Sequence, residues 1–279
     1  MRRRFSYILL FIGICVFFIT LWTKDIIEES QKERLYAEIV TSSGYREQNI
    51  GEEMLGYLRK CSNPGESAAL FLLESKYGYD TWNYDWTEGT FQMLKQKWKE
   101  HPSWETYYET TCAIWNDVMY FPIPKSTSEV ELEVSYVDSW MLERTYGGKR
   151  GHEGTDLMAK ENQRGFYPIL SMTDGVVVKK GWLEKGGYRI GIESPSGAYF
   201  YYAHLDSYAR LQEGDVVKAG DVLGYMGDSG YGPEGTTGKF PVHLHLGVYI
   251  YPNGEEVSVN PYWVLRYIEN RKVKCYTEI

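Results

Sequence analysis

The chain lacks the surplus of basic residues that a nucleic-acid-binding protein needs. Its 279 residues include 30 Lys and Arg against 38 Asp and Glu, which gives a formal net charge of −8. Because nucleic acid is bound by a clustered basic face, this balance argues against a nucleic-acid partner. A hydrophobic content of 43% is enough for an ordinary core, so we expect one large or two modest folded domains rather than a disordered chain.

Cysteine is scarce, with four residues in the whole chain. Cys15 lies inside an apolar run, so no lipobox cysteine follows that run. The other three are Cys61, Cys112 and Cys275, and an odd number leaves one without a disulfide partner. We hypothesise that Cys61 pairs with Cys112. None of the cysteines is positioned as a metal ligand.

Long apolar runs are absent except at the N-terminus, where residues 5–22 follow the basic cluster Met1-Arg2-Arg3-Arg4. At 1.5 Å per residue the run spans roughly 27 Å, enough for the hydrocarbon core of a bilayer. The arginines should remain cytoplasmic and leave everything after Lys24 outside. Residues 17–23 lack the small-x-small pattern of a signal-peptidase site, so we expect residues 1–23 to be an uncleaved, single-pass anchor in the cell membrane. A cleaved signal peptide is the alternative.

Residues 24–120 have a helical pattern. The charged stretch 24–45 predicts a helix that continues out of the membrane, as a stalk or a pairing helix. Further helices are expected at 52–59, 66–77, 90–100 and 104–120, with Pro102 and Ser103 opening the last one. This helical module shows no catalytic spacing, so we expect it to serve packing; a surface for a substrate or partner is the alternative.

Residues 121–128 contain two prolines followed by small polar residues, which predicts a linker. The remainder, residues 129–279, is β-rich. Strands are expected at 130–137, 165–171, 175–180, 188–193, 198–204, 221–226 and 243–250, separated by glycine-containing turn signals. This spacing predicts a mainly β domain built as an antiparallel β-sandwich.

Four of the five histidines fall in this β-rich part. His243 and His245 are two residues apart in an alternating run, so a strand would place both imidazoles on one face. His152 and Asp156 lie in a polar, glycine-rich stretch that can bring a nitrogen and a carboxylate oxygen to one point. Imidazoles and one carboxylate form the ligand set of a catalytic Zn²⁺, with a fourth position left open.

These motifs resemble the lysostaphin/LytM-type zinc endopeptidases, which cut the peptides of peptidoglycan. The matching segments are His152-x-x-x-Asp156, Tyr202-Ala203-His204-Leu205 and His243-x-His245, in that order. The resemblance implies an antiparallel β fold in which His152, Asp156 and His245 bind zinc. It also implies that His204 and His243 are catalytic residues that position or deprotonate water and stabilise the oxyanion.

The segment 227–241 departs from this family, because it is longer than the short link that often precedes the family's His-x-His motif. Its glycines and its place beside the site predict a wall of the substrate groove. Glu234 and Lys239 are candidates for contact with a peptide. The choice of peptide therefore stays open.

Two functions follow as hypotheses. The first is a membrane-anchored zinc endopeptidase whose extracytoplasmic C-terminal domain hydrolyses peptide bonds of peptidoglycan in cell-wall remodelling. The second is a non-hydrolytic scaffold or regulator that binds another cell-wall enzyme through the helical module. Members of that second kind often lack a metal ligand, whereas this chain has the complete set, so we favour the first.

Overall fold

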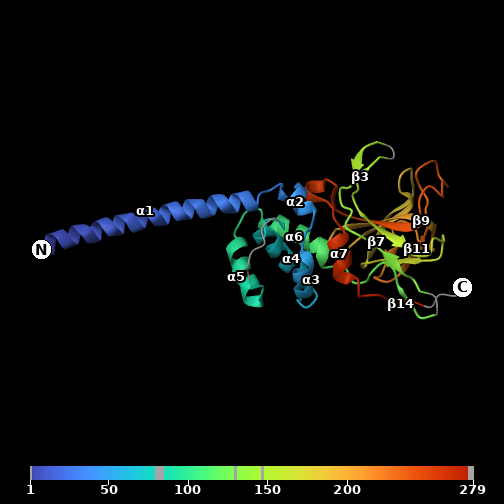
Figure 1. The fold of residues 1–279 in the computed structure, drawn as a ribbon, viewed down its shortest axis with the longest axis horizontal. Helices are drawn as coiled ribbons and strands as arrows, with labels where there is room; N and C mark the ends of the chain where they lie inside the picture. Colours follow the sequence, from blue (N-terminus) through green and yellow to red (C-terminus); the bar gives the residue numbers. More distant parts are fainter. Residues whose placement is uncertain (1, 79–84, 129–130, 146–147, 276–279) are drawn as a thin grey trace.

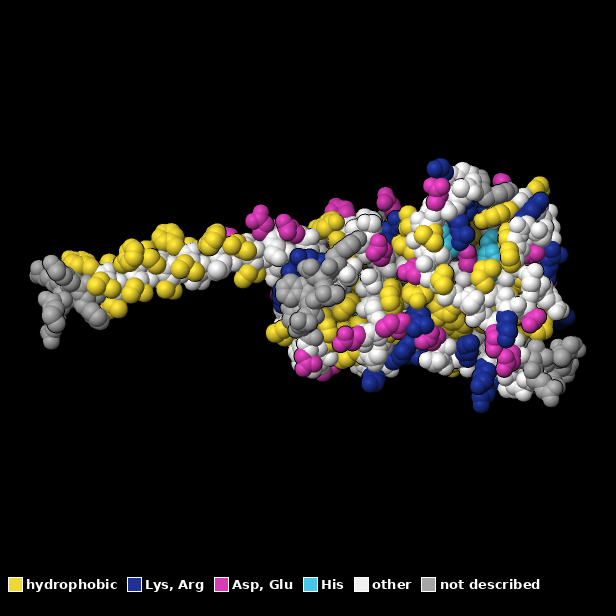
Figure 2. Space-filling view, viewed as in Figure 1, with side chains coloured by type: hydrophobic (Ala, Val, Ile, Leu, Met, Phe, Trp, Pro, Cys, Tyr) yellow, Lys and Arg dark blue, Asp and Glu magenta, His cyan; other side chains and the backbone are white. Residues whose placement is uncertain are grey.

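The computed structural model describes residues 2–78, 85–128, 131–145 and 148–275. A single long helix, α1 (Arg2–Arg34), projects from a group of shorter helices, and the β domain lies at the opposite end of the molecule (Figure 1). The apolar run and the charged stretch after it therefore share one helix. Between Tyr7 and Gln31 this helix is long and apolar enough to cross a membrane, a test that a signal sequence also meets. Its apolar side chains are exposed (Figure 2).

The helical module contains the expected helices, with small differences at their ends. After η1 (Ile39–Thr41) and α2 (Ser43–Arg46) come α3 (Gly51–Leu58), α4 (Pro64–Glu74), α5 (Glu88–Trp98) and α6 (Trp104–Trp115). The start of α4 follows from its sequence, because the Asn63 side chain accepts a hydrogen bond from the backbone N–H of Glu66 and proline occupies the first turn.

The last of these helices starts at Trp104, as predicted, but it ends earlier than predicted. Pro102 lies outside α6, and the helix ends at Trp115 instead of Tyr120. Beyond that point the backbone N–H of Met119 donates to the carbonyl of Met172 in the β domain. The local pattern favoured more helix, but a hydrogen bond to the neighbouring domain replaces the helical one.

The helical module is stabilised by packed side chains, as its sequence predicts. Tyr45, Tyr77 and Tyr107 form a buried cluster of ring contacts. Glu74 is 1% exposed, and its carboxylate accepts hydrogen bonds from Arg34 at 3.1 Å, from Lys97 at 2.7 Å and from the indole of Trp98 at 2.7 Å. A buried carboxylate needs such partners, so this charge has a structural role.

The β domain is a mainly antiparallel sheet, which confirms the expected fold class. Its main path runs in the order β10-β7-β8-β9-β12-β5-β2, while β11 pairs with β9 and β6, and β13 pairs with β12. The strand bounds are β2 Val134–Ser135, β5 Thr155–Ala159, β6 Pro168–Leu170, β7 Gly175–Leu183, β8 Gly187–Glu193, β9 Tyr199–Tyr208, β10 Val216–Val217, β11 Val222–Met226, β12 His243–Ile250 and β13 Val257–Val259.

Several elements differ from the sequence prediction. The expected strand 130–137 contains only the two residues of β2, and Val130 lies outside the described residues. A hairpin of β3 (Glu143–Arg144) and β4 (Arg150–Gly151) was not predicted. The turn η2 (Pro252–Gly254) and the helix α7 (Tyr262–Ile268) were also not predicted.

The segment 121–128 is packed rather than an exposed linker. Phe121 and Ile123 are 1% and 0% exposed, and β1 (Lys125–Ser126) pairs in parallel with β14 (Lys274–Cys275). The prolines do prevent a helix, but the apolar residues next to them, Phe121 and Ile123, enter the core. The helical module and the β domain consequently share one continuous hydrophobic core.

The hypothesised Cys61–Cys112 disulfide is absent, because all four cysteines are free thiols. Cys61 lies just after α3, and its Sγ atom is 3.3 Å from the carbonyl oxygen of Leu58, the last residue of that helix. Cys112 is buried on α6. The module is therefore stabilised by packing and hydrogen bonds without a covalent link.

Candidate metal centre and substrate cleft

Strand pairing brings the first set of candidate residues together. On β12, His245 lies opposite Asp156 of β5 in the antiparallel register. His152 comes from the loop between β4 and β5 and reaches the same point. Gly154 allows this approach, since a Cβ at that position would lie 2.5 Å from the His245 ring.

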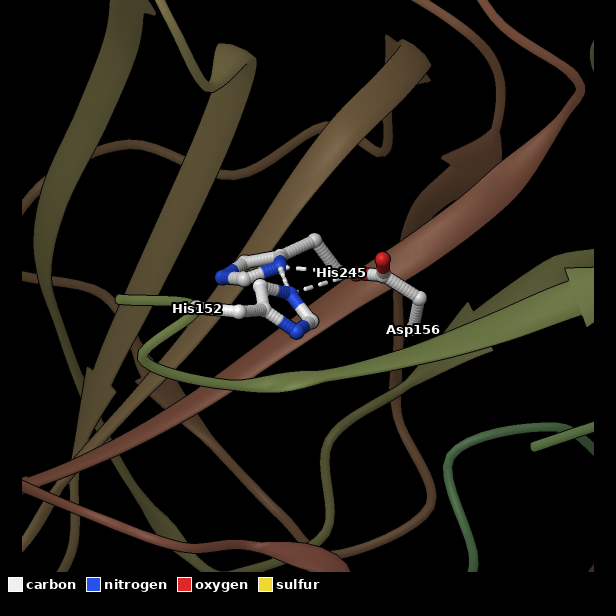
Figure 3. A group of neighbouring side chains, drawn as sticks. All are labelled: His152, Asp156 and His245. Carbon is white, nitrogen blue, oxygen red and sulfur yellow. Dashed lines mark hydrogen bonds and ion pairs between the residues drawn. The ribbon is translucent and has the colours of Figure 1, made fainter. Parts of the chain in front are cut away.

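The three candidate metal ligands converge through one donor atom each (Figure 3). The His152 Nε2 atom lies 3.0 Å from Asp156 Oδ1 and 3.0 Å from His245 Nδ1, and His245 Nδ1 lies 2.9 Å from Asp156 Oδ1. Two imidazole nitrogens and a carboxylate oxygen facing one point fit a zinc-type donor set. Sequence reasoning proposed these three residues, and the structure places them together.

Two of the three ligand candidates, His152 and Asp156, are held by a second contact. The other ring nitrogen of His152, Nδ1, lies 2.9 Å from the Ser139 hydroxyl, and Arg144 donates to Asp156 Oδ2 at 2.6 Å. Burial opposes ionisation of the Asp156 carboxyl, but hydrogen bonds from His152 and His245 outweigh it and hold the pKa of that carboxyl well below its usual range. Such outer contacts orient metal ligands and fix the imidazole tautomer.

His204 reaches the site through an irregular backbone. In the β8–β9 pairing the register shifts between Tyr188, opposite Leu205, and Ile190, opposite Tyr202. His204 lies in this bulge with a φ of 62°, a left-handed conformation that is unusual for histidine. Bulges often redirect a side chain next to an active site. Here the ring of His204 lies 4.7 Å from that of His243, centroid to centroid.

His204 and His243 are oriented in the same way. The Nδ1 atom of each lies 2.8 Å from a backbone carbonyl oxygen, Ser229 for His204 and Pro241 for His243. Burial lowers the pKa of His204 well below its usual value and also lowers the pKa of His243. The Nε2 atom of His243 lies 3.8 Å from Asp156 Oδ1. Both rings are thus neutral imidazoles beside the three-ligand cluster.

All four histidines line one cleft with a volume of about 660 Å³. Figure 2 shows histidine side chains (cyan) in a hollow of the surface, with basic and hydrophobic side chains around them. The long segment 227–241 supplies part of the wall, as expected, through Tyr231 and Phe240. Glu234 and Lys239 are not among the described residues that line the cleft.

Sequence reasoning missed several cleft residues. Arg144, Arg189, Tyr199, Tyr201 and Tyr249 line the cleft although no motif marked them. Tyr201 and Tyr199 could have been found from strand alternation, since they are two and four residues from Ala203, which pairs with His245. Arg144 has no comparable signal, because it comes from the unpredicted hairpin. His101, the fifth histidine, lies before α6 and accepts a hydrogen bond from the Ser103 backbone, away from this site.

Comparison with known proteins agrees with this geometry. Residues 150–261 match the peptidase family M23 and residues 30–117 match the LytM N-terminal domain. The structure superposes on the crystal structure of a "putative glycyl-glycine endopeptidase lytM" from Ruminococcus gnavus ATCC 29149 with a TM-score of 0.84. The two chains are 54% identical in sequence, and the match covers 89% of this chain and 99% of the Ruminococcus chain.

Curated relatives match over shorter regions. The L-Ala--D-Glu endopeptidase of Bacillus subtilis (strain 168) is 44% identical over 147 residues, which is 52% of this chain and 42% of the relative. Lysostaphin of Staphylococcus simulans is 36% identical over 66 residues, 23% of this chain and 13% of the relative. The chain thus spans less than half the length of these two proteins. The near-complete match to the Ruminococcus structure, together with the domain matches, shows that the chain belongs to the LytM-type peptidases of family M23.

Proposed function

We propose that this protein is a zinc-dependent endopeptidase that hydrolyses peptide bonds of peptidoglycan in cell-wall remodelling. The observation that carries the proposal is the convergence of His152, Asp156 and His245 beside two further imidazoles in one open cleft. The names of the relatives support the substrate class, since they read "putative glycyl-glycine endopeptidase lytM" and "L-Ala--D-Glu endopeptidase".

In this proposal His152 Nε2, Asp156 Oδ1 and His245 Nδ1 hold the metal. When bound, zinc supplies Lewis acidity at the scissile carbonyl and favours ionisation of water near neutral pH. Arg144 keeps the second oxygen of Asp156 occupied, so that one oxygen of the carboxylate faces the two imidazoles.

His204 and His243 are the proposed catalytic residues. The backbone carbonyls of Ser229 and Pro241 accept from the Nδ1–H of each ring, which leaves each Nε2 as the nitrogen that meets the substrate. A neutral Nε2 can accept a proton from water, and after protonation it can donate to the carbonyl oxygen or to the leaving amine. Burial favours the neutral form that this role needs.

We also propose a cellular location for the protein, based on the apolar helix α1. We place residues 1–23 as a cell-membrane anchor, residues 24–120 as a helical module and residues 129–279 as an extracytoplasmic peptidase domain. The apolar length of α1 supports an anchor, and a signal sequence would equally place the peptidase outside the cytoplasm. The packed segment 121–128 joins the two folded parts.

The test is metal content together with muropeptide release. The full chain in detergent should contain about one zinc per molecule and release new peptide termini from isolated peptidoglycan, and His245→Ala should lose both. Zinc binding without cleavage of any peptidoglycan type, combined with capture of a cell-wall enzyme, would instead support the non-hydrolytic scaffold.

The proposed catalytic roles need separate variants. His204→Ala and His243→Ala should each retain zinc and lower kcat by about 10²–10⁴-fold, the range for general acid–base groups. His101→Ala is the matched control, because it removes the histidine that lies in the helical module. Hydrolysis at the wild-type rate in either cleft variant would disprove its assigned role.

A further inference from the structure

Arg189 lies on the cleft floor in line with the proposed metal centre. Antiparallel register places His245 of β12 opposite Ala203 of β9, and Arg189 of β8 lies opposite the bulge formed by Ala203 and His204. On the other side Arg189 pairs with Gly181 of β7, where an added Cβ would meet open space. Neighbouring strands are about 4.8 Å apart, so Arg189 is about 10 Å from His245 across the sheet.

The guanidinium of Arg189 has no partner within the described part of the chain. Its Nη1 atom is buried and makes no hydrogen bond, and no described carboxylate forms an ion pair with it. Buried polar groups are nearly always hydrogen-bonded, and an unpaired one costs free energy. Because Arg189 also lines the open cleft, the part of its side chain that faces the cleft is available to an anionic ligand.

Two of the three acidic residues that line the cleft form ion pairs with arginine, and the third accepts a hydrogen bond from a neutral hydroxyl. Asp156 accepts from Arg144, Glu153 accepts from Arg46, and Glu256 accepts from the Tyr251 hydroxyl. Lys179 and Lys185 also line the cleft, and neither forms an ion pair with any residue that the structure describes. The cleft thus offers unpaired positive charge although the whole chain has a net charge of −8.

The rings beside Arg189 shape this part of the cleft. Tyr199 and Tyr201 follow one another on the same face of β9, and their ring centroids lie 6.4 Å apart. Burial raises the pKa of Tyr199 to about 12, and the positive charge of Arg189 opposes that rise. Both phenols therefore stay neutral near pH 7, where each hydroxyl can donate a hydrogen bond to a ligand and adds no negative charge to the cleft.

We propose that Arg189, flanked by Lys179 and Lys185, is a carboxylate-recognising subsite of this cleft. The inference rests on the proposed endopeptidase function and deepens it: the preferred substrate is a peptide with a free carboxylate within one or two residues of the scissile bond. An arginine fork can hold both oxygens of a carboxylate, whereas a carboxamide offers one acceptor and no charge.

The test uses two synthetic peptidoglycan-stem peptides that differ only in whether the acidic residue bears a free α-carboxylate or a carboxamide. The full-length wild type should cut the carboxylate peptide with at least about tenfold higher kcat/KM. Arg189→Gln should remove this preference by raising KM for the carboxylate peptide, with the carboxamide peptide unchanged, and Arg189→Lys should restore part of it.

Arg210→Gln is the matched control. Arg210 is exposed in the same domain and does not line the cleft, so its loss changes the charge equally and should preserve the preference. If Arg189→Gln lowers cleavage of both peptides equally, or if the wild type shows no preference, the subsite assignment is wrong.

A binding measurement distinguishes failure of the subsite assignment from failure of the proposed endopeptidase function. Calorimetry with the full-length His204→Ala chain should show tighter binding of the carboxylate peptide, an advantage that added salt reduces and that Arg189→Gln removes. If the wild type cuts neither peptide but this binding difference persists, the endopeptidase proposal fails and the subsite stands. Equal cleavage and equal binding of both peptides would overturn the subsite alone.

Discussion

Arg46 of the helical module donates a hydrogen bond of 2.7 Å to Glu153, the neighbour of the proposed metal ligand His152. The same side chain also donates to the carbonyl and hydroxyl oxygens of Ser258, and the Arg46 carbonyl accepts from the backbone N–H of Asn260. The helical module therefore contacts and stabilises the edge of the cleft through Arg46. It is part of the structural frame of the site rather than a distant stalk.

We expect Arg46→Ala to lower the thermal unfolding midpoint more than Glu153→Gln. The Glu153 side chain is 46% exposed, so the ion pair alone contributes about 0–1 kcal/mol. Arg46→Ala also leaves the Ser258 oxygens without their donor, at an added cost of about 1–2 kcal/mol. Differential scanning calorimetry of both variants checks this order. Equal midpoints would show that the contacts to Ser258 contribute nothing.

Arg144→Gln should weaken zinc binding by about 10–100-fold, the usual effect of removing an outer partner of a metal ligand. Arg144 donates to Asp156 Oδ2 at 2.6 Å and leaves Oδ1 to face His152 and His245. Titration with a competing chelator measures the change. Lys149→Gln is the control, because Lys149 pairs with Glu143 at the exposed end of the same hairpin. Unchanged zinc affinity in Arg144→Gln would mean that the imidazoles alone orient the carboxylate.

Gly187→Ala should lower kcat while zinc stays bound. A Cβ at Gly187 would lie 2.2 Å from the carbonyl oxygen of Ser229, and that oxygen is the partner of His204 Nδ1. The substitution therefore displaces the group that orients His204. Gly197→Ala is a matched control, since Gly197 also has a positive φ, of 88°, but faces open space. Both substitutions strain the backbone. Equal activity in the two variants would contradict the specific role of Gly187.

Cys112 should react slowly with thiol reagents at pH 8 in the folded protein and rapidly after denaturation. Burial raises its pKa from 9.0 to about 11, so little thiolate is present in the native state. Because the folded pKa is the higher one, this thiol favours folding fully below pH 9 and less as the pH rises toward 11. Thiol counting on the unreduced, denatured chain should give four free groups. A count of two free thiols would instead support the hypothesised Cys61–Cys112 disulfide.

Local sequence patterns determined the main elements of this protein. The alternating run around His243 and His245 forms β12 with the predicted bounds, because strand periodicity depends on neighbouring residues alone. The apolar run after Arg4 forms one helix for the same local reason. The spacing of His152 and Asp156, read with the family resemblance, also indicated which residues to bring together.

Only the tertiary structure decided how these pieces are placed. The φ of 62° at His204 depends on a bulge between β8 and β9, and the buried segment after Phe121 depends on packing between two domains. Arg144 and Arg189 reach the cleft from a hairpin and from a strand that carry no motif. Each of these features results from contacts between residues far apart in the chain, and local propensity contains no information about such contacts.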